Sequence, residues 1–128
     1  MKSWKELRDY LMNNYGTISE YDEEDDSILM TVPLENDRSQ MVNIGRGKTL
    51  IIFSSLIGDI HKNDLKDALN DLWGLLYGKM CCDDDGDCSI VHCENIETLT
   101  ENKIDTILST IAITADELEE KYIGKDIY

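Results

Sequence analysis

The sequence predicts an α+β domain in which an antiparallel sheet packs against helices. Three observations lead to this fold class. Short segments rich in Ile, Val, Tyr and Thr follow one another with short connections, as in an antiparallel sheet. Segments with helical periodicity precede, interrupt and follow them. With 128 residues, of which 41% are hydrophobic, the chain has the size and composition of one domain spanning residues 1–128.

The first predicted element is a helix that begins after Ser3. Ser3 and Glu6 match the capping-box pattern, in which two side chains satisfy free amides at a helix N-terminus. Gly16 is placed to end this helix. Its apolar residues repeat at the spacing of one helical face, which predicts contact with a core: Trp4, Leu7, Leu11 and Tyr15.

Four strands are predicted next, each bounded by turn residues. They cover residues 17–21, 27–34, 39–45 and 49–57, and an acidic turn over 22–26 joins the first two. Consecutive strands joined by such short turns pair with their neighbours, so we expect an antiparallel sheet.

Two helices and a hairpin complete the predicted order. The middle helix begins at Asn63 or Asp64 and ends at Gly78. Strands over 79–82 and 87–93 then form a hairpin. The last helix begins after Thr100 and runs to Gly124. Its apolar residues fall within an arc of ~100°, the width of a face that rests on one core: Ile104, Ile107, Leu108, Ile111, Ala115, Leu118 and Tyr122.

The middle helix is apolar around more of its circumference than the last helix. Its apolar residues between Leu65 and Tyr77 spread over ~200°. Such a helix is either enclosed within its own domain or contacts a second chain. For the second case we expect a homodimer, the commonest assembly, anchored by the aromatic residues. The predicted interface consists of Leu69, Leu72, Trp73, Leu76 and Tyr77.

The formal net charge is −15, and the acidic residues are concentrated in two clusters. One comprises Glu20 and residues 22–26, and the other comprises Asp83, Asp84, Asp85 and Asp87. Such a field repels phosphate backbones and anionic lipid, so we expect neither a nucleic acid nor a membrane as partner. The clusters either keep the protein soluble or attract a basic protein segment.

The chain shows no segment that predicts export or a membrane span. No apolar run approaches the ~20 residues of a transmembrane helix. The first residues lack the apolar core of a signal peptide. We therefore expect a cytoplasmic protein, in which the four cysteines are thiols.

Two short motifs resemble ligand-binding loops but fail in their context. Gly47-Lys48-Thr49 matches the end of a phosphate-binding loop, but Val42 stands where that motif needs glycine, and a strand follows instead of a helix. The segment 83–87 resembles a calcium loop, but Cys81 and His92 stand at its two outer ligand positions. We expect both segments to be hairpin turns and predict no cofactor.

The cysteines gather on the predicted hairpin, at positions 81, 82, 88 and 93, with His92 beside them. Strand pairing brings Cys81 or Cys82 close to Cys88, so a regulatory disulfide is one alternative. A zinc site is another, but neighbouring strand residues point to opposite faces and diverge. We expect buried structural thiols and no metal, since free cysteine packs as a small hydrophobe.

The residues for catalysis are few. There are two histidines, His61 in a loop and His92 on a strand, and no serine lies in a nucleophile-elbow pattern. A Cys–His pair that meets only in space stays an alternative. We expect no enzymatic activity and name no catalytic residue.

Two short sequence segments, taken together with the order of the predicted elements, indicate a family resemblance. Residues 38–44, Arg-Ser-Gln-Met-Val-Asn-Ile, precede a strand that ends at residues 54–58, and residues 111–119 form Ile-Ala-Ile-Thr-Ala-Asp-Glu-Leu-Glu on the last helix. This succession, over roughly residues 1–124, resembles the YbjN-like family, which is grouped by fold with the class I type III secretion chaperones. The Arg-Ser-Gln strand is a feature of the YbjN-like side.

The resemblance implies an α-β-β-β-α-β-β-α sandwich, here with a possible fourth strand before the middle helix, that forms a homodimer and has no catalytic activity. Secretion chaperones of this fold are small and acidic, and they hold an extended segment of a client protein. Arg38 and Gln40 share one face of their strand. They are candidates for partner binding, although a structural ion pair at the start of the strand is the simpler expectation.

The leading functional hypothesis is a chaperone-like module that binds a protein partner. Two alternatives belong to other classes. One is a metal- or redox-responsive protein built on the cysteine hairpin, and the other is a small acidic inhibitor or immunity-type protein that neutralises a basic enzyme.

Overall fold

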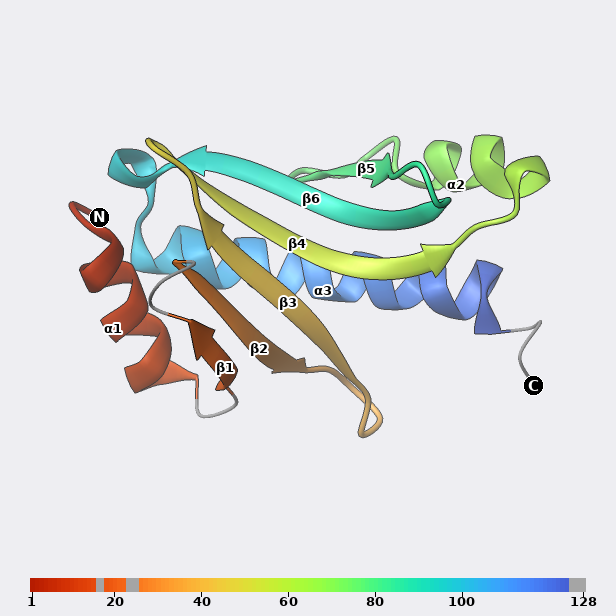
Figure 1. The fold of residues 1–128 in the computed structure, drawn as a ribbon. Helices are drawn as coiled ribbons and strands as arrows, with labels where there is room; N and C mark the ends of the chain where they lie inside the picture. The colour runs from red at the N-terminus through yellow and green to blue at the C-terminus, as the bar shows by residue number, and fades with distance from the viewer. Residues whose placement is uncertain (16–17, 23–25, 125–128) are drawn as a thin grey trace.

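A computed structural model of the chain describes residues 1–15, 18–22 and 26–124. Six strands form one sheet in the order β1-β2-β3-β4-β6-β5, and every neighbouring pair is antiparallel. Three helices accompany the sheet (Figure 1). The predicted α+β fold class is therefore confirmed, with four strands before the second helix.

The elements follow one another in an order that is close to the predicted one. In chain order they are α1 (Trp4–Asn14), β1 (Ile18–Asp22), β2 (Ser27–Pro33), β3 (Ser39–Arg46), β4 (Leu50–Asp59), the 3₁₀ turn η1 (Lys62–Asp64), α2 (Leu65–Asp71), β5 (Lys79–Cys82), β6 (Asp87–Asn95), the 3₁₀ turn η2 (Ile96–Thr98) and α3 (Glu101–Tyr122).

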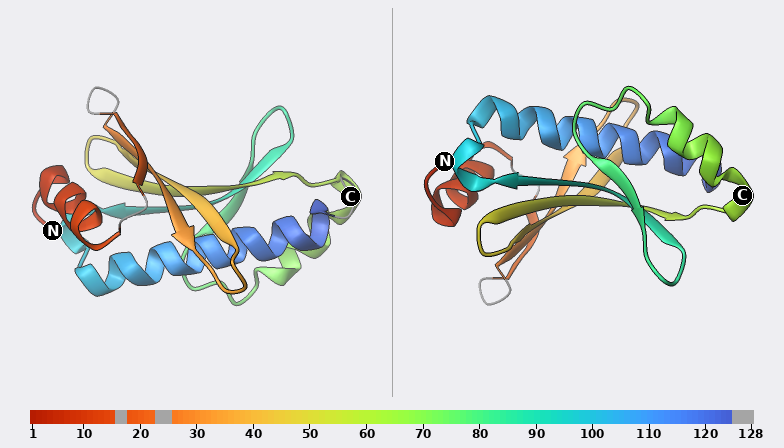
Figure 2. Two further views of the ribbon diagram at one scale, coloured as in Figure 1. Left: turned by 90° about the horizontal axis from the view of Figure 1, so that it is seen from below. Right: turned by 90° about the horizontal axis from the view of Figure 1, so that it is seen from above.

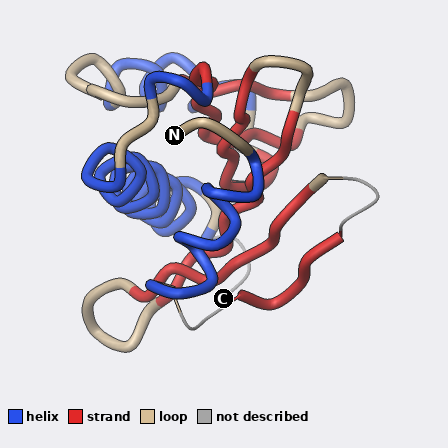
Figure 3. The backbone as a smooth tube through the Cα atoms, turned by 90° about the vertical axis from the view of Figure 1, so that its left-hand side faces the viewer, coloured by secondary structure: helices blue, strands red, loops and turns tan. Residues whose placement is uncertain are grey.

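Helices and sheet form two layers. Figure 2 shows α3 lying along the sheet, with the β2–β3 hairpin crossing over this helix. Figure 3 shows α3 nearly end-on beside the strands. The apolar face predicted for α3 is buried from Ile104 to Leu118. Alternate residues of β2, β3 and β4 supply the other side of the core, as their period-two burial shows. Phe53 and Ile44 are among its fully buried side chains.

The helix caps confirm the predicted starts of two helices. The Ser3 side chain accepts a hydrogen bond from the Glu6 amide, and the Thr100 side chain accepts one from the Lys103 amide. Helix α1 ends at Asn14, and the Gly16 expected to end it lies outside the described residues, as do residues 23–25 of the predicted acidic turn.

Helix α1 is tied to α3 by two phenols. Tyr10 donates a hydrogen bond to Asp105 Oδ1 over 2.8 Å, and Tyr15 donates one to the same oxygen over 2.6 Å. Burial, followed by the hydrogen bond to Asp105, raises the pKa of Tyr10 to about 12, and the same causes raise the pKa of Tyr15. The N-terminal helix is thus anchored by protonated tyrosines on one carboxylate.

The middle helix differs most from its prediction. It was expected to begin at Asn63 or Asp64 and to end at Gly78, but α2 covers only Leu65–Asp71. Residues 72–78 form turns instead, with amide-to-carbonyl bonds spanning three residues from Leu72 to Leu69 and from Leu75 to Leu72. Gly74 explains part of this, since glycine costs about 1 kcal/mol in a helix relative to alanine.

None of the helices in the described ranges combines the length and the apolar character that a membrane span requires.

Candidate functional site

The exposed apolar side chains of residues 65–77, here called the α2 segment, form the first candidate surface. Trp73 is 93% exposed, Leu76 79% and Leu69 55%. Large apolar side chains at such exposure are unusual when they lie close together, and they mark interaction sites. The α2 segment therefore presents apolar surface that its own domain does not cover.

The other predicted interface residues of this segment face the opposite way. Leu72 and Tyr77 are half-buried and pack against the core, together with Leu75, while Ala68 is fully buried. The ~200° arc assumed a continuous helix to Tyr77, so that argument is wrong, because the helix ends at Asp71. The turns after Asp71 nevertheless leave Trp73 and Leu76 exposed.

Asp71 fixes the α2 segment to the end of α3. Its Oδ2 accepts hydrogen bonds from Lys121 Nζ over 2.8 Å and from the Tyr122 hydroxyl over 2.6 Å. These two donors, Lys121 first, lower the pKa of Asp71 below its ordinary value. The exposed tryptophan therefore stands on a segment that is anchored at its helical end.

The two sequence segments on which the family resemblance rests are in contact in the folded chain. Arg38 lies before β3 and Asp116 lies on α3, and the guanidinium Nη2 is 2.8 Å from Asp116 Oδ1. Arg38 Nη1 is also 3.0 Å from Glu120 Oε2. The hydrogen bond to Asp116 is the main cause that raises the pKa of Arg38. The ion pair expected at the start of this strand is present.

Gln40 points inward and is only 8% exposed. Its Nε2 donates to Ser55 Oγ over 3.1 Å and to the Leu56 carbonyl over 2.9 Å, while Ser55 Oγ donates to the Met41 carbonyl over 2.6 Å. Gln40 is therefore a buried link between β3 and β4. Sequence reasoning missed Ser55, although its inward position between Phe53 and Ile57 on an alternating strand was a signal.

The outer face of the sheet carries further exposed apolar side chains that sequence reasoning did not single out. Met41 on β3 is 43% exposed, and Ile52 and Leu56 on β4 are 38% and 59% exposed. They alternate with the buried residues of the same strands, so they point away from the core. Met41 and Leu56 lie beyond the last paired residues of β3 and β4, Asn43 and Ser54, and there they share a hollow with Asp116 and Glu119 of α3.

Two grooves lie on either side of the Arg38–Asp116 ion pair. The first has a volume of about 550 Å³ and lies between the β2–β3 turn and α3, with Val32, Leu34 and Ile113 among its walls. The second, of about 520 Å³, contains Met41 and Leu56. Arg38 and Asp116 line both grooves and form the ridge between them.

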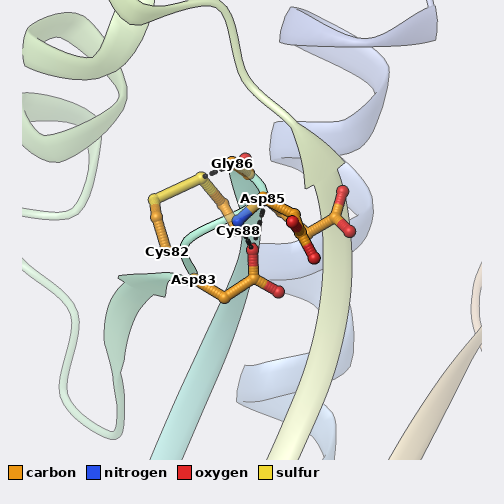
Figure 4. Close-up of a disulfide and its surroundings, with 6 residues drawn as sticks. Cys82, Asp83, Asp85, Gly86 and Cys88 are labelled. Carbon is orange, nitrogen blue, oxygen red and sulfur yellow. Dashed lines mark hydrogen bonds between the residues drawn. A yellow bond between two sulfur atoms is a disulfide. The ribbon is translucent and has the colours of Figure 1, made fainter.

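The expectation of four buried thiols on the β5–β6 hairpin is wrong. Cys82 and Cys88 face each other across β5 and β6 and form a disulfide (Figure 4). Cys88 is buried, whereas Cys81 and Cys93 are exposed free cysteines. Pairing of the strands placed Cys82 directly opposite Cys88, as one sequence alternative anticipated, and Cys81 on the other face.

The acidic turn of this hairpin is organised by its own backbone. Asp83 Oδ1 accepts hydrogen bonds from the amides of Asp85 and Asp87. In the part of the chain that the structure describes, no group of three or more His, Cys, Asp or Glu side chains is placed to hold a metal ion. The Asp83 side chain thus stabilises the turn by accepting hydrogen bonds from its backbone.

The two histidines have structural partners. His61 Nδ1 accepts a hydrogen bond from the Asn63 amide at the start of η1. His92 Nε2 lies 3.1 Å from Glu94 Oε1, and the Tyr77 ring packs edge-on against its imidazole. Lys103 Nζ lies 2.8 Å from the other Glu94 oxygen. Although burial opposes it, hydrogen bonding to Lys103 and His92 lowers the pKa of Glu94.

Comparisons with known proteins bear on the fold. No model of a protein family matches the sequence, and no curated protein matches it either. Solved structures do match. One is the complex of ExoU with SpcU from the type III secretion system of Pseudomonas aeruginosa, at TM-score 0.66 and 12% identity, over 91% of this chain and 97% of that chain.

Further matches extend the same pattern. The Yersinia pestis type III secretion chaperone SycH, in complex with a fragment of YscM2, aligns at TM-score 0.62 and 17% identity, over 91% of this chain and 99% of that one. YbjN from E. coli, described as a putative transcription regulator, aligns at TM-score 0.51 and 13% identity, over 97% and 91% of the two chains. The chain therefore has the fold shared by the type III secretion chaperones and YbjN.

Proposed function

We propose that this protein is a chaperone-like module without enzymatic activity that holds an extended segment of a partner protein. The observation that carries the proposal is the exposure of Trp73 and Leu76, at 93% and 79%, on a fold that is similar to that of the type III secretion chaperone SycH, solved with a fragment of YscM2. Apolar surface that a domain leaves uncovered is covered by another chain.

We further propose that the α2 segment forms a homodimer. Leu69, Trp73 and Leu76 are the anchors, because they are exposed while the neighbouring Leu72 and Leu75 already pack on the core. A twofold axis through such a patch places like residues against like and needs no second type of surface. This leaves the outer face of the sheet and the grooves beside Arg38 for the partner.

The acidic field favours a basic partner segment. With a net charge of −15, the protein attracts cations at long range, which raises the rate of encounter more than the final affinity. A cytoplasmic location completes the proposal, and there the exposed free cysteines Cys81 and Cys93 would stay reduced.

The test is recovery of the partner from the source cell. A tagged chain is crosslinked in the cells and purified, and the bound species is identified by mass spectrometry and by nuclease treatment. We expect a protein whose bound segment resists proteolysis only in the complex and is disordered when free. A nucleic acid, a small-molecule substrate or a folded basic enzyme as the bound species would overturn the proposal.

One observation favours a second function, a redox-responsive protein. Cys82 and Cys88 form a disulfide whose Cys82 side is exposed, next to the exposed Cys81. An exposed disulfide beside a thiol is open to thiol–disulfide exchange. In a cytoplasm the bond would be reduced by default, so its state in cells separates the two functions.

A further inference from the structure

We propose that the two grooves beside Arg38 form one docking surface for a basic segment that carries apolar side chains between its lysines or arginines. This inference rests on the proposed function and deepens it by placing the partner and stating its chemistry. The surface comprises the ridge of Arg38 and Asp116 with the groove on each side, and is here called the Arg38 saddle.

The apolar part of the saddle is exposed on both sides of the ridge. Ile113, in the first groove, is 43% exposed, and Met41 and Leu56, in the second, are 43% and 59% exposed. Each groove has a volume of several hundred Å³, large enough for an apolar side chain of an extended peptide. Two grooves that share a ridge suit a segment that crosses it.

The charge of the saddle selects the occupant. Carboxylates line both grooves, with Glu35, Glu117 and Glu120 in the first and Glu119 in the second, while Arg38 is their only cation. Arg38 is already paired with Asp116 and Glu120. Among the described residues, the carboxylates of Glu35, Glu117 and Glu119 have no ion-pair partner, so a partner cation finds uncompensated charge.

The ridge is also held in place by hydrogen bonds, which lowers the entropic cost of binding. Arg38 holds Asp116 directly, and the next inward residue of β3, Gln40, is held by Ser55 and the Leu56 carbonyl. A preformed surface loses little side-chain freedom when a segment docks.

A second copy of this chain does not fit the charge of the saddle, because its surface is acidic as well.

The experiment measures the fluorescence anisotropy of labelled synthetic peptides with the full chain. The probes are peptides of equal length in which Leu alternates with Lys, Leu with Glu, and Ser with Lys. We expect the Leu/Lys peptide to bind most tightly. The double variant Glu35→Gln/Glu117→Gln should weaken its binding roughly fivefold, and Ile113→Ser should do so by a similar factor.

Matched controls lie elsewhere on the chain. Asp84→Asn/Asp85→Asn removes the same charge from the β5–β6 turn, and Leu50→Ser removes an apolar side chain that is 43% exposed, like Ile113. Both should change the affinity less than about twofold. If the saddle variants bind like the wild type, or the Leu/Glu peptide binds as tightly, this inference is overturned while the proposed function stands. If no peptide binds, the proposed holding of extended segments is overturned with it.

Discussion

Asp105 shows how a single carboxylate sets the pH range of an interhelical contact. It accepts hydrogen bonds from Tyr10 and Tyr15 and so joins α1 to α3. An unfolded tyrosine ionises near pH ~10, whereas burial and Asp105 raise the pKa of Tyr10 to about 12 in the fold. Because the folded state keeps its protons longer, the stabilisation is complete below pH ~10 and is lost as the pH rises through the folded pKa.

The variant Asp105→Asn tests this contact. It removes the negative charge, so the tyrosines should ionise at lower pH than in the wild type, and the loss of stability above pH ~10 should be less steep. Ultraviolet absorbance of tyrosinate during a pH titration measures the first effect, and denaturant unfolding at several pH values measures the second. Asp67→Asn on α2 is the control. An unchanged tyrosine titration in Asp105→Asn would refute the assignment.

The positions of single residues could be predicted from the sequence more readily than their side-chain partners. The inward position of Ser55 follows from alternation on β4, but its partner Gln40 lies on another strand. The two residues lie beyond the last paired residues of β3 and β4, Asn43 and Ser54, and their side chains meet across the gap. An ion pair of Arg38 was expected, but the sequence did not identify its partner. Asp116 lies 78 residues further along the chain. Such pairs depend on tertiary packing, which short-range patterns do not contain.

At the scale of elements, strands and caps were predictable and the middle helix was not. The strands followed from β-rich segments between turns, and the caps of α1 and α3 followed from Ser3 and Thr100. The apolar residues after Asp71 have helical spacing, but Leu72 and Leu75 pack on the core from turns. Tertiary packing of a few apolar residues outweighed a weak local preference interrupted by Gly74.

The bulge in β4 gives a prediction for that strand. Gly58 lies at the register shift opposite Cys88, with φ of +121°. A Cβ there would lie 2.6 Å from Ile123 Cδ1. Gly58→Ala should therefore lower the free energy of unfolding by about 1–3 kcal/mol. In Gly74→Ala the new Cβ meets nothing within 4 Å, so a change below about 0.5 kcal/mol is expected. Denaturant unfolding curves compare the two, and equal stabilities would contradict the strain at Gly58.

The β5–β6 hairpin predicts a thiol count. Denatured without reductant, the protein should show the two free thiols of Cys81 and Cys93, and the Cys82→Ser/Cys88→Ser variant should show the same number. Reduction should lower the free energy of unfolding by about 2 kcal/mol, because the bond restricts the unfolded chain. Cys81→Ser/Cys93→Ser should keep that response. Four titratable thiols after the folded protein has been exposed to oxidised glutathione would remove the redox function from consideration.

At the scale of the whole molecule, the helices cover one face of the sheet and leave two kinds of surface open. The α2 segment exposes Leu69, Trp73 and Leu76, and the Arg38 saddle exposes apolar side chains among carboxylates. The first surface is largely apolar and suits a second copy, whereas the second is acidic and suits a basic segment. In this account the dimer and the partner therefore use different surfaces.

The measurement that tests this account most directly is light scattering after gel filtration at high micromolar concentration. The account predicts about twice the chain mass of 14.6 kDa for the wild type. Trp73→Glu should shift the protein to the monomer, because it places an unpaired charge at the contact. The control Leu50→Glu adds the same charge at an exposed apolar position away from α2 and should stay dimeric. A wild type that elutes as a monomer at every concentration would contradict the account.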